Sequence, residues 1–241
     1  SGITAPAREV TDGIKILRFP MKFSLSNNFL FWDFEKELEE IKEVKSYGIL
    51  DGVTTNPSLI KKAVEELKKK GKKIDIEGYI KQILKVCGKL PVSLEVIGTN
   101  YDDMVSEGKI LKKKFGRFGN VYVKIPVDPC IEDKCSKDAD GIKAIKKLRG
   151  LGIKINCTLV FTPEQAYLAS KAGANYVSPF MGREDDYIRE INRIKFDKKD
   201  YFPKDGYKKG KKILEDNGIV SGVDLVSECV NVLRGSKTEV L

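Results

Sequence analysis

Short strand-like runs alternate with helical segments along most of this 241-residue chain, and this alternation restricts the fold more than any other feature. The runs are rich in β-branched and aromatic residues, whereas the segments between them repeat apolar residues at helical spacing. The expected strands are residues 29–33, 52–55, 91–97, 120–126, 154–160, 175–180 and 238–241. This pattern predicts a parallel α/β sheet. The chain has neither a glycine-rich dinucleotide loop nor a P-loop, which argues against an open nucleotide-binding sheet.

The first strand has two candidate positions. Phe29–Asp33 is favoured and ends in a carboxylate, and Met21–Leu25 is the weaker candidate. If the weaker candidate forms the strand, Ser26 takes the strand-end position in place of Asp33, and proton transfer at that position is lost.

Polar side chains lie at or just after the ends of successive expected strands. They are Asp33, Asn56, Glu95, Lys124, Asn156, Ser178 and Arg183. In a (β/α)8 TIM barrel these strand ends converge on one mouth, where such barrels carry their chemistry. The length suits one such barrel or two small domains, and the series of strand ends favours the barrel. We therefore expect a barrel domain over residues 21–241 with one shared site, preceded by a leader of unknown role at residues 1–20.

Lys124 has the most chemical interest in this set. It lies on the apolar strand Asn120–Pro126, where burial makes the ammonium form costly and favours the neutral amine. A neutral lysine amine attacks carbonyl carbons and forms Schiff bases. Taken alone, a lysine near a strand end more often extends its ammonium into water. The polar residues on the neighbouring strand ends favour the nucleophile.

The composition restricts the partners. The 44 Lys and Arg residues against 35 Asp and Glu residues give a net charge of +9, which suits anionic partners such as phosphorylated metabolites. Most lysines alternate with acids on helical segments, and no RNA-binding or helix-turn-helix pattern is present, so nucleic acid is not an expected partner. The chain contains no run of roughly 18 apolar residues, so no transmembrane helix is expected.

The cysteines are Cys87, Cys130, Cys135, Cys157 and Cys229. This odd and scattered set suits a reducing cytoplasm better than a disulfide framework. Because the chain contains no histidine, a zinc site at Cys130 and Cys135 is not expected.

Several of these strand-end segments together resemble the transaldolase family, and more narrowly its short-subunit branch, which also contains fructose-6-phosphate aldolases. The match runs from about Phe29 to Leu241, with the motifs in the expected order. The segments that carry it are Gly52–Leu59, Val92–Val96, Val123–Pro126, Ile155–Phe161 and Tyr176–Arg183.

The resemblance implies a class I aldolase barrel that works without a metal or an organic cofactor. Lys124 would form the Schiff base with a ketose phosphate. Glu95 would transfer protons through a water held with Thr158, and Asp33 would be the acid/base for the C4 hydroxyl.

The resemblance also implies a set of substrate-binding residues. They are Asn56 and Asn156 for hydroxyls, Ser178, Thr55 and Phe180 in the pocket wall, and Arg183 for phosphate. Simpler roles remain open for some of them. Asp33 and Asn56 are also suited to capping a helix, Ser178 to a structural role, and Arg183 to pairing with Asp185 or Asp186.

Within the branch, three features favour a transaldolase over an aldolase that releases dihydroxyacetone. Glu95 stands where the aldolases carry glutamine, and Asn156-Cys157-Thr158 keeps the transferase pattern. Phe180 stands where the aldolases carry tyrosine, whose hydroxyl would help to protonate and release the three-carbon unit.

Two features depart from the family pattern. The chain stops at the strand near Thr238–Leu241, whereas the family continues with a loop, a helix and an eighth strand, so we expect a barrel without its C-terminal strand and helix. An alternative is a permuted order in which residues 2–14 supply these elements. Segment 187–218 is longer than the family pattern and is interpreted as an insertion on the catalytic face, acting as a lid, a phosphate contact, an oligomer contact or a solvated helix.

The expected function is a cytoplasmic, homo-oligomeric transaldolase of the pentose phosphate pathway. The implied donors are sedoheptulose 7-phosphate and fructose 6-phosphate, and the implied acceptors are glyceraldehyde 3-phosphate and erythrose 4-phosphate. Two alternatives remain: a fructose-6-phosphate aldolase, and an inactive or truncated barrel that acts as a binding module.

Overall fold

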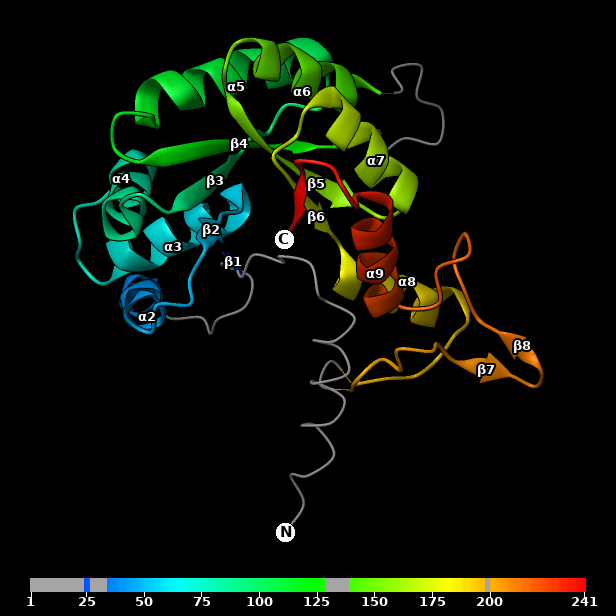
Figure 1. Ribbon diagram of the computed structural model, residues 1–241. Helices are drawn as coiled ribbons and strands as arrows, with labels where there is room; N and C mark the ends of the chain where they lie inside the picture. Colours follow the sequence, from blue (N-terminus) through cyan, green and yellow to red (C-terminus); the bar gives the residue numbers. More distant parts are fainter. Residues whose placement is uncertain (1–23, 27–33, 129–138, 198–199) are drawn as a thin grey trace.

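A parallel, strongly curved sheet is the centre of the fold. The computed structural model describes residues 24–26, 34–128, 139–197 and 200–241 (Figure 1). In these residues seven parallel strands form one sheet, in the order β1-β2-β3-β4-β5-β6-β9. They are β1 (Ser24–Ser26), β2 (Gly52–Thr54), β3 (Pro91–Glu95), β4 (Asn120–Pro126), β5 (Lys154–Val160), β6 (Tyr176–Pro179) and β9 (Glu239–Val240). Sheet order follows chain order, as expected for successive β–α units.

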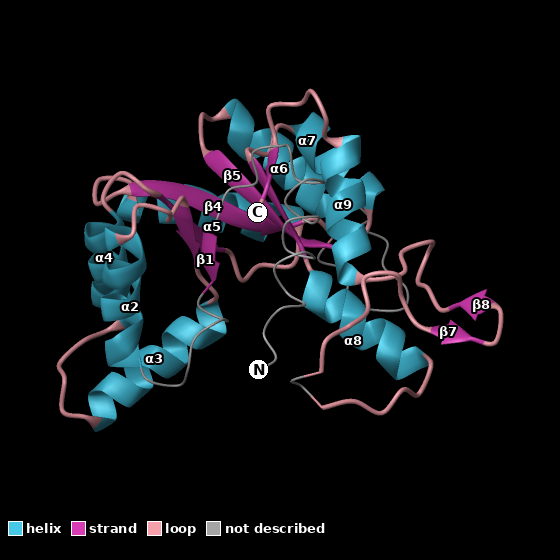
Figure 2. Ribbon diagram, turned by 60° about the horizontal axis from the view of Figure 1, so that its bottom comes forward, coloured by secondary structure: helices cyan, strands magenta, loops and turns pink. Residues whose placement is uncertain are grey.

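Helices lie around the outer side of this sheet (Figures 1 and 2). They are α2 (Phe34–Ser46), α3 (Pro57–Lys69), α4 (Ile76–Cys87), α5 (Tyr101–Phe115), α6 (Asp140–Gly150), α7 (Pro163–Ala172), α8 (Met181–Ile191) and α9 (Gly222–Val232). In the described part of the chain, none of them combines the length and hydropathy needed to cross a bilayer.

One hydrogen bond and one cavity demonstrate the curvature of the sheet. The Asn156 side-chain amide on β5 donates to the Ser93 hydroxyl on β3 at 3.1 Å, across the intervening strand β4. A small cavity at the other end of the strands is lined by residues of β2, β3 and β6 together with Leu241. Strands that are separated in the sheet therefore approach each other on its concave side.

The predicted α/β architecture is confirmed, and the position of the first strand needs a correction. Among the described residues the first strand is β1, Ser24–Ser26, which overlaps Met21–Leu25, the weaker of the two predicted positions. Its register pairs Ser26 with Thr54 of β2. The favoured segment, Phe29–Asp33, lies outside the described residues. So do residues 1–20, including the permutation candidate, and Cys130 and Cys135.

Helix ends follow local sequence signals. A capping box begins α7: the Thr162 hydroxyl accepts from the Gln165 backbone N–H at 3.2 Å, and the Gln165 side chain accepts from the Thr162 backbone N–H. Pro57 begins α3, as expected for a residue that lacks an N–H donor. Gly48, which follows α2, has a φ of 74° that few other residues adopt.

Two apolar cores lie between the sheet and the helices. The larger joins β4, β5 and β6 to α5, α6, α7 and α9, and includes Ile125, Leu148 and Val177. The second joins β2 and β3 to α2, α3 and α4, and includes Tyr79 and Val92.

The expected insertion, segment 187–218, begins within α8 and carries a two-stranded hairpin of β7 (Lys208–Lys209) and β8 (Lys212–Ile213). The hairpin projects away from the sheet (Figure 1). Arg189 anchors the segment on α8: its side chain is 4% exposed and donates to the Asp200 carbonyl at 2.8 Å. The guanidinium also stacks on Phe196 and Phe202.

The helices on either side of this segment, α8 and α9, begin next to each other. A side chain on Gly222 would place Cβ 2.3 Å from the Met181 carbonyl oxygen, so the first turns of α8 and α9 touch. Because α8 follows β6 directly, the segment is attached at the carboxyl ends of the strands.

Candidate active site

Lys124 and Glu95 form a pair at the carboxyl ends of β3 and β4. The two residues lie directly opposite each other in the parallel register. The Lys124 Nζ donates to the Glu95 Oε2 at 3.4 Å, and Lys124 is only 7% exposed. Burial raises the pKa of the Glu95 carboxyl, and the Lys124 charge opposes that rise. The pair thus combines a buried amine with a carboxyl whose pKa is raised above its ordinary value.

Asn156 is the centre of a buried hydrogen-bond network beside this pair. It lies opposite Lys124 in the register of β4 and β5. Its amide donates to the Ser93 hydroxyl at 3.1 Å, and its carbonyl oxygen accepts from the Ser178 hydroxyl at 2.9 Å. Sequence reasoning missed Ser93, although a serine two residues before Glu95 on an apolar strand was an available signal.

Thr158 adds a buried hydroxyl to the same side of β5. The residue is 0% exposed, and its Oγ1 has no hydrogen-bond partner among the described residues. A buried hydroxyl without a partner is costly, so this atom is suited to bind a polar group that enters the site.

Asn56 and Thr55 lie at the end of β2. The Asn56 Oδ1 caps α3 by accepting from the N–H groups of Ser58 and Leu59, at 2.9 and 3.3 Å. The capping role is therefore present, and the amide Nδ2 is the part of the side chain left to donate to a ligand. Thr55 is buried, and its hydroxyl donates to the Ser93 carbonyl at 2.8 Å.

Arg183 is exposed in the first turn of α8. The two carboxylates proposed as its alternative partners make other contacts: Asp185 accepts from the Gly222 N–H, and Asp186 pairs with Arg189. Phe180 precedes α8 and packs edge-to-face on Phe161, with ring centroids 5.7 Å apart.

Asp33 lies outside the described residues, so the strand-one acid has no described position. The other candidate for that position, Ser26, ends β1 and pairs in register with Thr54.

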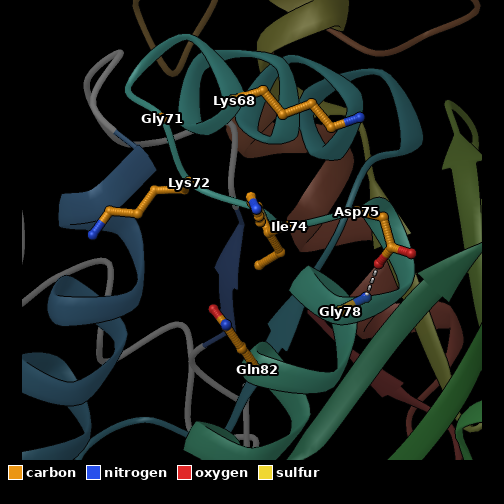
Figure 3. A pocket seen from close by; sticks show the side chains of 8 residues that line it. Lys68, Gly71, Lys72, Ile74, Asp75, Gly78 and Gln82 are labelled. Atoms are coloured by element: carbon orange, nitrogen blue, oxygen red, sulfur yellow. Dashed lines mark hydrogen bonds between the residues drawn. The ribbon is translucent and has the colours of Figure 1, made fainter.

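Two hollows lie near α3. A groove of about 920 Å³ is bordered by Thr55, Asn56 and Glu95 and continues between α3, α4 and α5. A second hollow of about 740 Å³ lies at the turn between α3 and α4 (Figure 3). There the amines of Lys68 and Lys72 point away from each other, so they do not form a shared anion site.

Glu184 also carries a buried carboxyl, and sequence reasoning missed this residue. It follows Arg183 in α8, is 1% exposed, and its Oε1 has no hydrogen-bond partner in the described part of the chain. Burial, with Asp216 and Asp185 nearby, raises the pKa of this carboxyl to about 7. No group of acidic or cysteine side chains in the described ranges is arranged to hold a metal ion.

Glu184→Gln is expected to stabilise the protein at alkaline pH. The folded-state pKa of about 7 exceeds the ordinary value of 4.5, so the wild type loses stability as pH rises from 4.5 to 7. The free energy of unfolding of the variant, minus that of the wild type, should be about 2–3 kcal/mol larger at pH 8 than at pH 5. Urea unfolding of both proteins at the two pH values measures this difference. Glu190→Gln, at an exposed position of the same helix, is the control, and equal effects of the two substitutions would contradict the prediction.

Comparison with known proteins identifies the family. The Transaldolase/Fructose-6-phosphate aldolase family matches residues 31–241. A "Probable transaldolase" of Nitrosopumilus maritimus is 45% identical over 165 residues, which are 68% of this chain and 64% of the relative. A protein of the same name from Phocaeicola vulgatus is 47% identical over 155 residues, 64% of this chain and 62% of the relative. One from Bdellovibrio bacteriovorus is 50% identical over 151 residues, 62% of this chain and 59% of the relative.

The matched region spans less than two thirds of the length of each of these relatives. The family match covers most of the chain, including every described strand-end residue discussed above from Asn56 to Arg183. The chain therefore belongs to the transaldolase/fructose-6-phosphate aldolase family.

Proposed function

We propose that the protein is a transaldolase that moves a dihydroxyacetone unit between sugar phosphates through a Schiff base on Lys124. The observation that carries this proposal is the buried Lys124–Glu95 pair, with 3.4 Å between amine and carboxylate, on adjacent strand ends beside Asn156. The curved seven-stranded parallel sheet supports a (β/α)8 barrel as the complete fold.

The first step is formation of the Schiff base. The Lys124 amine attacks the C2 carbonyl of the donor ketose phosphate, and loss of water gives an iminium ion. Glu95 protonates the hydroxyl of the carbinolamine, which then leaves as water. When the iminium is hydrolysed, Glu95 takes a proton from the attacking water. Its raised pKa supports the role, because a general acid works best with a pKa close to the pH of the reaction. The buried Thr158 hydroxyl suits the water that connects Glu95 to the reacting atoms.

The second step breaks the C3–C4 bond. The iminium accepts the bonding electrons and becomes an enamine, while the C4 hydroxyl loses its proton and becomes the aldehyde of the departing aldose phosphate. Because β1 ends at Ser26, which has no carboxylate, we propose that Asp33, which follows Ser26 in the chain before α2, is the base for that proton. The enamine then attacks the aldehyde of an acceptor aldose phosphate, and hydrolysis of the new iminium releases the product.

The remaining strand-end residues hold the substrate. Asn156, already oriented by Ser93 and Ser178, and the side-chain Nδ2 of Asn56 are proposed to bind hydroxyls of the dihydroxyacetone unit. Arg183 is proposed to bind the phosphate, and its exposed position at the start of α8 leaves the guanidinium available.

A fructose-6-phosphate aldolase on the same scaffold is the second candidate. Phe180 argues against it, because a phenyl ring has no hydroxyl to protonate the enamine. The enamine should then persist until an acceptor arrives. Omitting the acceptor aldose separates the two functions: steady release of dihydroxyacetone from fructose 6-phosphate would establish the aldolase.

Borohydride reduction in the presence of fructose 6-phosphate tests the proposal directly. Reduction converts the iminium to a stable secondary amine, so peptide mass spectrometry should find the added mass on the peptide that contains Lys124. A protein that gains no mass on this residue, although it binds the sugar phosphate, would refute the Schiff-base function and favour the binding module.

A further inference from the structure

Strand β5 contains a bulge one residue before its end. Leu159 has a φ of 56°, in the left-handed region that residues other than glycine, asparagine and aspartate seldom adopt. Cys157 pairs with Val177 of β6, and the next pair is Val160 with Pro179. Over this step β5 therefore contains one residue more than β6, which defines a β-bulge.

The bulge changes the side of the sheet that Val160 faces. In a regular strand, residues 158 and 160 would face the same side. Val160 is instead fully buried in the apolar core that also contains Cys157 and Ala166, on the helix side of the sheet. Thr158 is consequently the last side chain of β5 on the concave side, and no isopropyl group of Val160 stands above it.

The residues on either side of Leu159 are tied to different strands. The Val127 N–H, just after β4, donates to the Thr158 carbonyl at 2.9 Å. The Phe180 N–H, just after β6, donates to the Val160 carbonyl at 2.9 Å. The left-handed turn at Leu159 connects these two anchor points, so a change in its backbone conformation would shift Thr158 relative to Lys124.

We propose that Leu159 is a positioning residue, whose left-handed backbone ends β5 so that the Thr158 hydroxyl faces the Schiff-base lysine. The inference rests on the proposed function, because it assigns to Leu159 the placement of a group used in that chemistry. A backbone conformation that is unfavourable for leucine persists only where its surroundings enforce it, and such conformations cluster at functional sites.

The matched substitutions Leu159→Asn and Leu159→Val test this role, since they separate backbone preference from hydrophobicity. Asparagine tolerates the left-handed conformation, whereas a β-branched valine strongly disfavours it. Asparagine should keep kcat within about five-fold of the wild type, and valine should lower kcat by about 100-fold, the scale expected for a misplacement of about 1 Å in an active site. KM should change little in either variant, and valine should also lower the melting temperature more than asparagine.

The same two substitutions at Leu111, a half-buried residue of helix α5, are the control. There hydrophobicity should decide, so valine should melt at a higher temperature than asparagine and kcat should not change. If valine retains more activity than asparagine at position 159, or if both variants match the wild type in kcat, the positioning role is wrong. A wild-type protein that forms no borohydride adduct would instead refute the proposed function. The melting temperatures test the backbone separately: if Leu159→Val melts at a higher temperature than Leu159→Asn, residue 159 does not have the left-handed conformation.

Discussion

Lys124→Met is expected to abolish transfer of the dihydroxyacetone unit, with a loss of turnover of about 10⁴-fold or more, as found when a covalent nucleophile is removed. Methionine is similar in length to lysine and apolar, so it fits a position that is 7% exposed without adding a buried polar group. It has no amine and cannot form the iminium ion. A coupled assay with fructose 6-phosphate and erythrose 4-phosphate, followed by borohydride trapping, measures both losses.

The variant should remain folded but respond differently to pH. In the wild type the Lys124 charge holds the pKa of the Glu95 carboxyl below the value that burial alone would produce. Without the amine this pKa rises further. A folded-state pKa above the unfolded value costs stability as pH rises through the interval between the two values. The variant should therefore lose more stability than the wild type between pH 5 and pH 8, which denaturant unfolding at the two pH values measures.

Lys154→Met is the matched control. Lys154 is a half-buried lysine of the neighbouring strand β5, and its amine donates to the Asn120 side chain at 2.9 Å, at the opposite end of β4 from Lys124. This variant should keep turnover within a few-fold of the wild type and should still be trapped on Lys124. An adduct that survives in Lys124→Met and disappears in Lys154→Met would place the Schiff base on Lys154 and refute its assignment to Lys124.

The proximity of Lys124 and Glu95 followed from sequence, because consecutive strands of a parallel β–α series are neighbours and strand ends align. The same argument placed Asn156 beside Lys124, since β4 and β5 follow each other in the chain. The starts of α3 at Pro57 and of α7 after Thr162 are set by local backbone chemistry, which does not depend on the rest of the fold.

Other features depend on tertiary contacts and leave little trace in the sequence. The three-residue strand β1 contains one apolar residue, Leu25, and is recognised by its pairing with β2 rather than by its composition. The bond between Ser93 and Asn156 crosses the concave side between strands that are not neighbours. Leucine at position 159 runs against the conformational preference of its own backbone, so propensity predicts a regular strand there.

Gly141→Ala is expected to destabilise the protein by about 3–5 kcal/mol, because overpacking against backbone atoms cannot be relieved by a side-chain rotation. A Cβ at Gly141 would lie 2.0 Å from the Pro126 carbonyl oxygen and 2.4 Å from that of Val127. The first turn of α6 is thus in direct contact with the end of β4, two residues beyond Lys124. Relief requires α6 or the end of β4 to move, so activity should fall together with stability.

Gly150→Ala, in the same helix, gives the matched comparison. No heavy atom lies within 4 Å of a Cβ at Gly150, and its φ is not positive. Alanine there should be neutral or should stabilise the protein by about 0.5–1 kcal/mol, because it removes the conformational entropy of a helical glycine. In urea unfolding, the changes in the free energy of unfolding of the two variants should therefore have opposite signs or differ by several kcal/mol. Equal changes would mean that the first turn of α6 does not pack tightly against the end of β4, and the close contact inferred at Gly141 would then be wrong.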